Sequence, residues 1–430
     1  MNIKYLFVVI LSLFLVSCST KDIAISEVKD ITTIEQKPYA YIDNFDLLDE
    51  DKQVDHYDNF LAKYFNPWNI NELSFSYEQA TWGLKYTTQE VYGENHRLIS
   101  KEWFEKIVNN SNYEKLNSLS KRAITVNYSH IRVFPTNSVI FHNPKKAGEG
   151  FPFDYNENSS IKPNVPLFVS HISLDKRWAF VESSFVLGWI DIKDIAFVDD
   201  EFIDSFKTGE YYVSVSDNLN IYKDGILIDD IELGTIFPKV DDKLLLAFRN
   251  INHSAYIGFI DDNDYIKQMP IKFDYENIKN ISDELIGQRY GWGGLYGHRD
   301  CSLMIRDFYT PFGIFLSRNS GDQRNDGVVF DLSNLDDNGK KEFIKNNGIP
   351  FLTIVYLRGH TMMYVGTLDG EPLVFHNMWG IRTKQKDGSS GRFIVGQSVV
   401  STLDIGSELP NFDSDNSMLS RILSITLLAQ

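Results

Sequence analysis

The stretch YGWGGLYGHRDCSLMIRDFYTPFG, residues 290–313, decides the fold of the C-terminal part of this chain. It contains Cys301, one of only two cysteines in 430 residues. Asp300 is a favourable N-cap residue, so the apolar run after it predicts a helix over 301–307 that is halted before Pro311. Cys301 is therefore expected in the first turn of a helix.

A cysteine in that position has the properties of a nucleophile. The unpaired N–H groups and the dipole of a helix N-terminus stabilise negative charge, so we expect the pKa of the Cys301 thiol to be lowered. The glycines of YGWGG would let the backbone come close to the sulfur or to a bound ligand. The alternative is a buried structural cysteine, which is common in folded proteins.

A nucleophilic thiol needs a base, and two histidines follow Cys301 in the chain, His360 and His376. Each lies in a predicted strand, HTMMYVG and PLVFHNMWG respectively. A three-residue loop over 368–370 would bring both imidazoles to one face of this hairpin as diagonal neighbours, whereas a two-residue turn would put them on opposite faces. We predict the three-residue loop, with one histidine as the base and the other as its orienting partner.

These residues allow two other interpretations. A single histidine in a strand is often a partly buried residue without a catalytic role, but two on one face downstream of a helix-borne cysteine favour chemistry. One cysteine and two histidines at these long spacings fit no compact zinc pattern, so no metal site is predicted. Acyl transfer by a cysteine also needs no organic cofactor.

Composition limits the class of protein. A chain of 430 residues exceeds the size of one hydrophobic core, and 43% hydrophobic with 23% charged residues is typical of folded domains. The formal net charge of -17 argues against nucleic acid as a partner. The sequence predicts no oligomeric state.

The N-terminus predicts export. Lys4 precedes an apolar run, LFVVILSLFLV, that is too short to span a bilayer, so residues 1–17 are expected to be a signal peptide. The sequence LVSC resembles the cleavage box of bacterial lipoproteins, in which Cys18 would carry the lipid; the alternative is an ordinary secretory signal. Ser19 after the cysteine predicts retention at the outer membrane. We therefore expect a periplasmic protein of a Gram-negative bacterium, with lipid chains at Cys18 as its membrane contact.

The hydrophobic pattern divides the rest of the chain. Residues 18–45 are polar and predict a tether, and residues 46–121 show helical periodicity. Short alternating strands between turn-formers predict two small β-barrels, over 122–199 and 208–270. Residues 275–430 give helices first and antiparallel strands after, which is an α+β pattern.

The C-terminal motifs resemble a known family. YGWGG, RDCS, LSRNSGDQ, GHTMMYVG and FHNMWG are similar to the motifs of NlpC-type murein endopeptidases, which are papain-like cysteine peptidases of bacterial cell walls. The match spans about residues 290–380. The upstream order resembles members with a helical stabilising domain and two bacterial SH3-like domains. The resemblance implies a papain-like α+β catalytic domain with a helix-borne cysteine and an antiparallel sheet carrying two histidines.

The resemblance also implies an activity. Cys301 would attack an amide of the peptidoglycan stem peptide, typically the bond between γ-D-glutamate and the diamino acid, and form an acyl-enzyme. His360 matches the general base and His376 the polar residue that orients it. The segment FPFDYNENSS, from Phe151 to Ser160, is expected to close the cleft. Other residues match positions near the cleft and are candidate substrate contacts: Tyr290, Asp300, Arg318, Ser320, Asp322, Gln323, Asp154 and Tyr155.

Two positions depart from the family pattern. Leu303 stands where a small residue is usual, and Ser317 stands where proline is common; neither removes a chemical group. Two alternative functions stay open: a non-catalytic peptidoglycan-binding lipoprotein, and a papain-like amidase or acyltransferase that acts on another substrate. The first would have been favoured by a missing cysteine or histidine.

Overall fold

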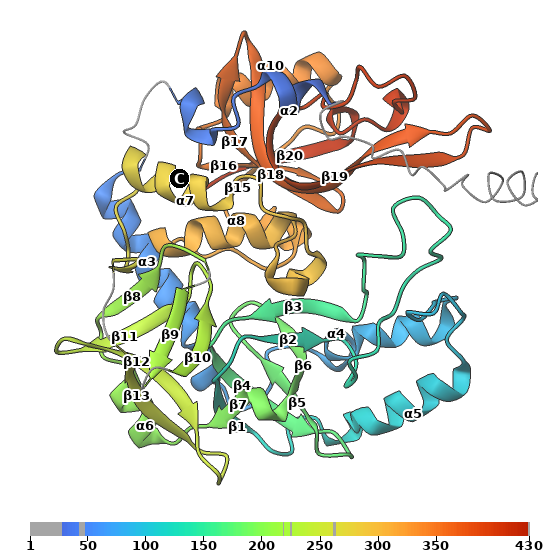
Figure 1. The fold of residues 1–430 in the computed structure, drawn as a ribbon. Coiled ribbons are helices and arrows are strands. Elements are labelled where there is room, and N and C mark those ends of the chain that lie inside the picture. Colours follow the sequence, from blue (N-terminus) through green and yellow to red (C-terminus); the bar gives the residue numbers. More distant parts are fainter. Residues whose placement is uncertain (1–27, 43–47, 218, 224–225, 261–263, 429–430) are drawn as a thin grey trace, which may run out of the picture.

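The computed structural model describes residues 28–42, 48–217, 219–223, 226–260 and 264–428. The expected signal peptide and Cys18 lie outside these residues. The chain forms two β-domains (green to yellow in Figure 1) and a C-terminal α+β domain (orange to red), with N-terminal helices packed along all of them. None of the helices in the described part is both long and apolar enough to cross a bilayer.

The described residues before position 43 do not form the tether that we predicted. They contain the short helix α2 (Lys29–Thr33) and the 3-10 helix η2 (Pro38–Tyr41). The buried Asp30 carboxylate accepts hydrogen bonds from the backbone N–H and the hydroxyl of Thr402 at 2.7 Å. Hydrogen bonds therefore anchor this segment to the C-terminal sheet.

Helix α3 (Glu50–Tyr64) is the longest element of the helical segment. Asp49 caps its N-terminus by accepting from the Asp51 N–H. The buried Gln53 side chain donates to the carbonyl oxygens of Ile271 and Phe312, so α3 ties the linker after the second β-domain to the C-terminal domain. The other helices of this segment are α4 (Tyr77–Ala80), α5 (Lys101–Ser111) and the 3-10 helices η3 (Asn66–Trp68), η4 (Trp82–Thr88) and η5 (Tyr113–Lys115).

The first β-domain is one seven-stranded antiparallel sheet in the order β3-β2-β6-β5-β4-β1-β7. Its strands alternate with turns, as the period-two pattern predicted. They are β1 (Lys121–Thr125), β2 (Ser129–Arg132), β3 (Glu157–Ile161), β4 (Pro166–Ile172), β5 (Trp178–Glu182), β6 (Leu187–Asp191) and β7 (Ile195–Phe197). The long loop between β2 and β3 reaches toward the C-terminal domain (Figure 1).

The second β-domain follows the short helix α6 (Asp200–Phe206). It has a five-stranded sheet in the order β13-β12-β11-β8-β14 and a β10-β9 pair. Its strands are β8 (Tyr211–Ser214), β9 (Leu219–Lys223), β10 (Ile226–Ile231), β11 (Ile236–Val240), β12 (Lys243–Arg249), β13 (Ala255–Ile260) and β14 (Ile266–Gln268).

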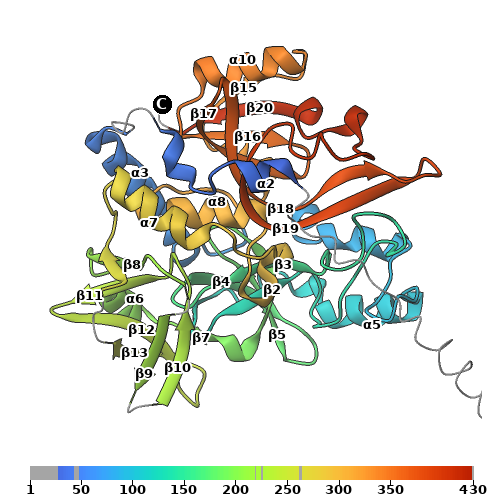
Figure 2. The same ribbon diagram turned by 45° about the horizontal axis from the view of Figure 1, so that its top comes forward.

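The C-terminal domain places helices α7 (Tyr275–Leu285) and α8 (Cys301–Tyr309) between its sheet and the two β-domains, as both views show (Figures 1 and 2). Its sheet has the order β15-β20-β16-β17-β18-β19. The strands are β15 (Val328–Asp331), β16 (Thr353–Leu357), β17 (His360–Leu368), β18 (Glu371–Lys384), β19 (Ser390–Thr402) and β20 (Ile422–Leu427). The remaining helices are α9 (Ser320–Gln323) and α10 (Asp337–Asn347), with the 3-10 segments η7 (Trp292–Gly297) and η8 (Thr310–Phe312) around α8.

Candidate active site

Cys301 is the first residue of α8, and Asp300 is the N-cap of that helix. The Asp300 carboxylate accepts a hydrogen bond from the Leu303 N–H at 2.9 Å. All nine residues of α8 are buried, and Cys301 is a free thiol that is 7% exposed. A backbone hydrogen bond from Thr361, the second residue of β17, reaches the Cys301 sulfur. The cysteine-bearing helix and the first residues of the histidine hairpin therefore meet at the thiol.

The β17–β18 hairpin has the predicted pairing of its histidine residues, but its turn differs from our prediction. The turn has two residues, Asp369 and Gly370, both with positive φ, and pairs Leu368 with Glu371. The three-residue loop that we predicted is therefore wrong. A β-bulge at Val365 inserts one extra residue into β17 and shifts the pairing back by one.

Beyond the bulge both imidazoles lie on one face, as predicted. His360 Nε2 lies 2.8 Å from His376 Nδ1, and His376 Nε2 lies 3.1 Å from the Ser401 hydroxyl on β19. Ser401 donates its own proton to the Thr402 carbonyl at 2.8 Å, so its oxygen accepts from His376. His376 Nδ1 then accepts from His360 Nε2–H, which leaves His360 Nδ1 as the nitrogen with a free lone pair.

The protonation states differ from the sequence prediction. Burial, and next the neighbouring Asp300 carboxylate, raise the pKa of the Cys301 thiol to about 12. Burial lowers the pKa of His360 to about 4 and that of His376 well below its ordinary value. Desolvation outweighs the helix N-terminus that we expected to lower the thiol pKa. At neutral pH the resting site therefore contains a neutral thiol and neutral imidazoles.

Asp300 and Arg318 support the start of α8 as an ion pair. Arg318 Nη2 donates to the Asp300 carboxylate at 2.7 Å, and its Nη1 donates to the Ser302 hydroxyl at 2.9 Å. Arg318 Nε donates to the Ser159 hydroxyl of β3 at 2.7 Å. Arg318 is 3% exposed, so its guanidinium connects the first β-domain to the cysteine-bearing helix.

Two cavities meet at the reactive residues. One is lined by Cys301, together with Asp300, Tyr155, Arg318 and Ser320. The other, of about 220 Å³, is lined by His360 and extends over β18, β19 and the C-terminal loops. Tyr290, Trp292 and Gly359 line both cavities and mark their junction. We call the cavity lined by Cys301 the thiol cavity and the cavity lined by His360 the imidazole cavity.

The loop between β2 and β3 contributes to this junction, as the sequence predicted for FPFDYNENSS. The Phe153 ring lies 5.2 Å from Trp292 and 6.0 Å from Trp379, measured between ring centroids. Phe151 contacts Tyr296 and Trp379. The first β-domain therefore provides one aromatic wall of the cleft.

Comparison with known proteins identifies the domains. Residues 287–390 match the NlpC/P60 family, residues 7–116 the N-terminal stabilising domain of NLPC_P60 proteins, and residues 140–191 an SH3 domain of the SH3b1 type. Residues 287–390 therefore contain an NlpC/P60 domain, preceded by the N-terminal stabilising domain and an SH3 domain. The multidomain architecture with an SH3-like domain, helices and antiparallel sheets is thereby confirmed. The SH3-like assignment of residues 208–270 stays a prediction.

One solved structure shares this fold over nearly its whole length. The structure of an NlpC/P60 endopeptidase from Photobacterium damselae subsp. piscicida is 24% identical, with a TM-score of 0.85, and the match covers 93% of this chain and 98% of that one. An NlpC/P60 family protein from Bacillus cereus is 16% identical, with a TM-score of 0.43, and the match covers 72% and 100% respectively. No protein with a curated description matches the chain. The NlpC/P60 match supports a cell-wall hydrolase function.

Gly293 lines the thiol cavity with Cys301, and two glycines of YGWGG also have a packing role that we did not expect. A Cβ atom on Gly293 would lie 2.5 Å from the Glu157 side chain, and one on Gly294 would lie 2.0 Å from the Ser160 hydroxyl. Both glycines have positive φ. They therefore let η7 pack directly on β3 of the first β-domain.

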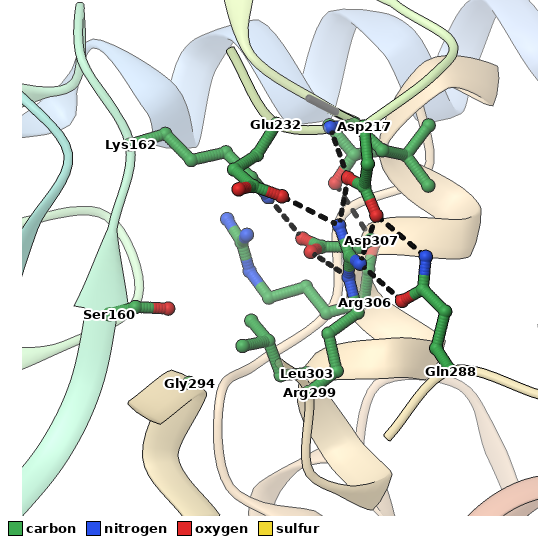
Figure 3. A network of polar contacts seen from close by, with 12 residues as sticks. Ser160, Lys162, Asp217, Glu232, Gln288, Gly294, Arg299, Leu303, Arg306 and Asp307 are labelled. Carbon is green, nitrogen blue, oxygen red and sulfur yellow. Dashed lines mark hydrogen bonds and ion pairs between the residues drawn. The ribbon is translucent and has the colours of Figure 1, made fainter. Parts of the chain in front are cut away.

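Leu303 also faces that interface. Its side chain is buried and lines a small cavity with Lys162 and Arg306, and Figure 3 shows it on α8 beside these charged residues. It lines neither the thiol cavity nor the imidazole cavity. The departure from the family pattern thus concerns domain packing and not the shape of the cleft.

A buried charge network joins the NlpC/P60 domain to both β-domains (Figure 3). Arg299 donates to both oxygens of Asp217, at 2.6 and 2.7 Å, and to Asp307 at 2.7 Å. Lys162 of the first β-domain pairs with the same Asp307. Burial, and next the Asp217 carboxylate, raise the pKa of Glu232 to about 8, so Glu232 is mainly protonated at neutral pH.

Of the remaining residues predicted to contact the substrate, some line the thiol cavity and others are buried within the protein. Tyr155 lines the thiol cavity and donates to Glu149 at 3.0 Å, and Ser320 lines the same cavity. Asp154 is 1% exposed and pairs with Arg132 at 2.8 Å, so it supports the loop and is not open to a substrate.

Asp322 and Gln323 lie on α9. Asp322 is exposed and accepts from Asn319, and it does not line either cavity. The buried Gln323 side chain donates to the Ser302 and Ser317 carbonyls. Within the described ranges, no three His, Cys, Asp or Glu side chains are grouped to hold a metal ion.

Sequence reasoning missed three groups of residues. Ser401 gives no signal of its own, because its role depends on the pairing of β18 with β19. Trp292 and Trp379 lie in the quoted motifs, but only their contacts with Phe153 place them in the cleft. The arginines of the imidazole cavity are spread between positions 358 and 421 and meet only in the folded sheet.

Proposed function

We propose that this protein is a cysteine endopeptidase that cleaves peptidoglycan stem peptides, at the bond between γ-D-glutamate and the diamino acid. The observation that carries the proposal is that Cys301 lines the thiol cavity and His360 the adjoining imidazole cavity, with His376 hydrogen-bonded to His360. The match of residues 287–390 to the NlpC/P60 family supports the substrate class.

The first half-reaction forms an acyl-enzyme. His360 Nδ1 takes the thiol proton as Cys301 Sγ attacks the amide carbonyl carbon. The raised pKa keeps the Tyr290 phenol protonated, so it can donate to the oxyanion together with N–H groups at the start of α8. The C–N bond then breaks as His360 returns the proton to the leaving nitrogen.

The second half-reaction releases the acyl group. His360 takes a proton from water, the hydroxide oxygen attacks the thioester carbon, and the C–S bond breaks as the sulfur regains a proton. His376 orients His360 throughout and stabilises the imidazolium that forms transiently, and Ser401 orients His376.

The proposal is tested with purified protein from residue 19 onward and defined stem peptides, with products resolved by mass spectrometry. We expect two fragments separated at the γ-D-glutamyl bond and no reaction with Cys301→Ala. Absence of cleavage with retained binding to cell walls would favour the non-catalytic lipoprotein. Transfer of the acyl group to an added amine in preference to water would favour an acyltransferase.

We also propose that Cys18 carries a lipid that holds the protein at the periplasmic face of the outer membrane. The support is the sequence LVSC followed by Ser19. In an expressing Gram-negative cell, the full-length chain should fractionate with outer membranes. Cys18→Ala should remove the lipid mass; an unchanged mass and location would overturn this proposal.

A further inference from the structure

A small cavity lies beside the cysteine-bearing helix α8, where four parts of the chain meet. Its volume is about 30 Å³, and its lining includes Arg306 of α8, Lys162 and Phe185 of the first β-domain, Thr235 of the second and Tyr64 of α3. Among the described residues that line it, the others are apolar or carry a hydroxyl, and none is an aspartate or glutamate. We call this the α8 cavity. Its lining residues line neither the thiol cavity nor the imidazole cavity, so it is distinct from the cleft.

Arg306 reaches this cavity without a polar partner. The residue is only 8% exposed, yet its side chain forms no hydrogen bond and no ion pair with any described residue, and Figure 3 shows no dashed line to it. Its guanidinium carbon lies 3.9 Å from the centroid of the Phe185 ring, and this cation–π contact supplies no anionic acceptor. Buried N–H groups are nearly always paired, and an unpaired charged group is costly to bury. The Arg306 N–H groups therefore require an acceptor that the described residues do not supply.

The charges beside the α8 cavity do not balance. Burial opposes the ionisation of Asp217 and Asp307, but the neighbouring cations lower both pKa values, so both carboxylates are ionised. Glu232, with a pKa of about 8, is mainly protonated at neutral pH. Burial lowers the pKa of Arg306 only to about 10, so its guanidinium is charged. The positive side chains of this network are Lys162, Arg299 and Arg306. Three cations with two carboxylates leave one positive charge in excess.

The size of the α8 cavity restricts what can supply the missing negative charge. One water molecule needs about 10–15 Å³ of such space. A cavity of about 30 Å³ therefore has room for a monatomic ion or for one or two water molecules, and a tetrahedral oxyanion such as phosphate is too large. A water molecule would accept a hydrogen bond from Arg306 but would leave the positive charge uncompensated. A halide ion accepts the hydrogen bonds and compensates the charge.

We propose that the α8 cavity is a binding site for a single chloride ion. The ion accepts hydrogen bonds from the guanidinium of Arg306, and Lys162, which pairs with Asp307, adds a second positive charge to the lining. Because the lining comes from α3, α8 and both β-domains, a bound ion stabilises the packing of these parts against one another. The site takes no part in bond breaking, so this inference is independent of the proposed function.

Thermal unfolding of the purified protein tests the site in two salts, sodium chloride and sodium gluconate, at equal ionic strength. The Tm of wild type should be about 1–3 °C higher in chloride, because the ion binds the folded state. Arg306→Gln should abolish this difference. Arg177→Gln removes an exposed arginine that lies over the Trp178 ring, and should retain it. Equal wild-type Tm values in the two salts, or an undiminished difference in Arg306→Gln, would overturn the site.

The position of the ion is measured directly in crystals of the wild-type protein soaked in sodium bromide. Bromide replaces chloride and scatters anomalously, so we expect an anomalous peak in the α8 cavity, in contact with the Arg306 guanidinium. This measurement needs no variant and therefore decides the question even if Arg306→Gln does not fold. Bromide at surface sites only, or density in the α8 cavity without an anomalous signal, would contradict the proposal and assign the space to water.

Discussion

The Nε2 atom of His360 lies 2.8 Å from the Nδ1 atom of His376, although the turn between their strands alone would place the two rings on opposite faces of the hairpin. The bulge at Val365 corrects the register. Since the other nitrogen of His376 contacts Ser401, whose proton is committed to a carbonyl, one hydroxyl fixes the proton positions of both imidazoles.

Removing that hydroxyl should lower the rate of chemistry more than the affinity for substrate. We expect Ser401→Ala to reduce kcat about 10- to 100-fold with little change in KM, because His376 loses the partner that fixes its tautomer. Ser424→Ala, at another buried serine of the same sheet, is the matched control and should keep kcat. A KM effect without a kcat effect would argue against the relay.

The thiol should remain un-ionised over the neutral range. Because burial raises the pKa of Cys301 to about 12, the thiolate fraction should rise continuously with pH up to that value. The rate of alkylation by iodoacetamide should therefore increase through pH 9 without a plateau. A plateau reached below pH 8 would show a thiolate–imidazolium pair and contradict a neutral resting site.

The loss of activity at acid pH should follow the protonation of His360. Its pKa of about 4 leaves the imidazole unprotonated and able to accept the thiol proton at every pH well above that value. We expect kcat/KM to fall only as pH drops below about 5, measured on a stem peptide. An acid limb centred near pH 6.5 would indicate a solvated histidine.

Glu232 should make stability fall as pH rises. Its pKa is about 8 in the folded protein and near 4.5 in the unfolded chain, so the folded state binds more protons between these values. The free energy of unfolding therefore decreases from pH 5 to pH 8. Glu232→Gln should flatten this slope in thermal unfolding curves; the same slope in the variant would assign it to another group.

Gly294 should be required for the packing of η7 on β3. Gly294→Ala adds a Cβ 2.0 Å from the Ser160 hydroxyl at a φ of 98°, so we expect a loss of about 2–4 kcal/mol in the free energy of unfolding. Gly287→Ala has a similar positive φ but open space around it, and should cost about 1 kcal/mol. Equal losses in the two variants would mean that backbone strain, and not packing on β3, dominates.

The sequence predicted the elements of this site better than their environment. The N-cap at Asp300 and the strand pattern around His360 and His376 are local signals, and they led to the correct helix and the shared face. The bulge at Val365 has no such local signal, so the turn was assigned wrongly.

The thiol pKa was predicted in the wrong direction for a related reason. Helix position can be read from neighbouring residues, whereas the burial of α8 comes from the sheet and from two distant β-domains. The roles of Gly293 and Gly294 likewise depend on β3, which precedes them by more than a hundred residues. Composition alone suggested a tether for residues that instead bind Thr402.

The mass of the protein during turnover tests the central claim most directly. Wild type that is acid-quenched while cleaving a stem peptide should carry the mass of the acyl fragment, mapped to the peptide that contains Cys301. Cys301→Ala should neither cleave the substrate nor gain that mass. Cleavage by Cys301→Ala at the wild-type rate, or an acyl group mapped to any other residue, would contradict Cys301 as the nucleophile.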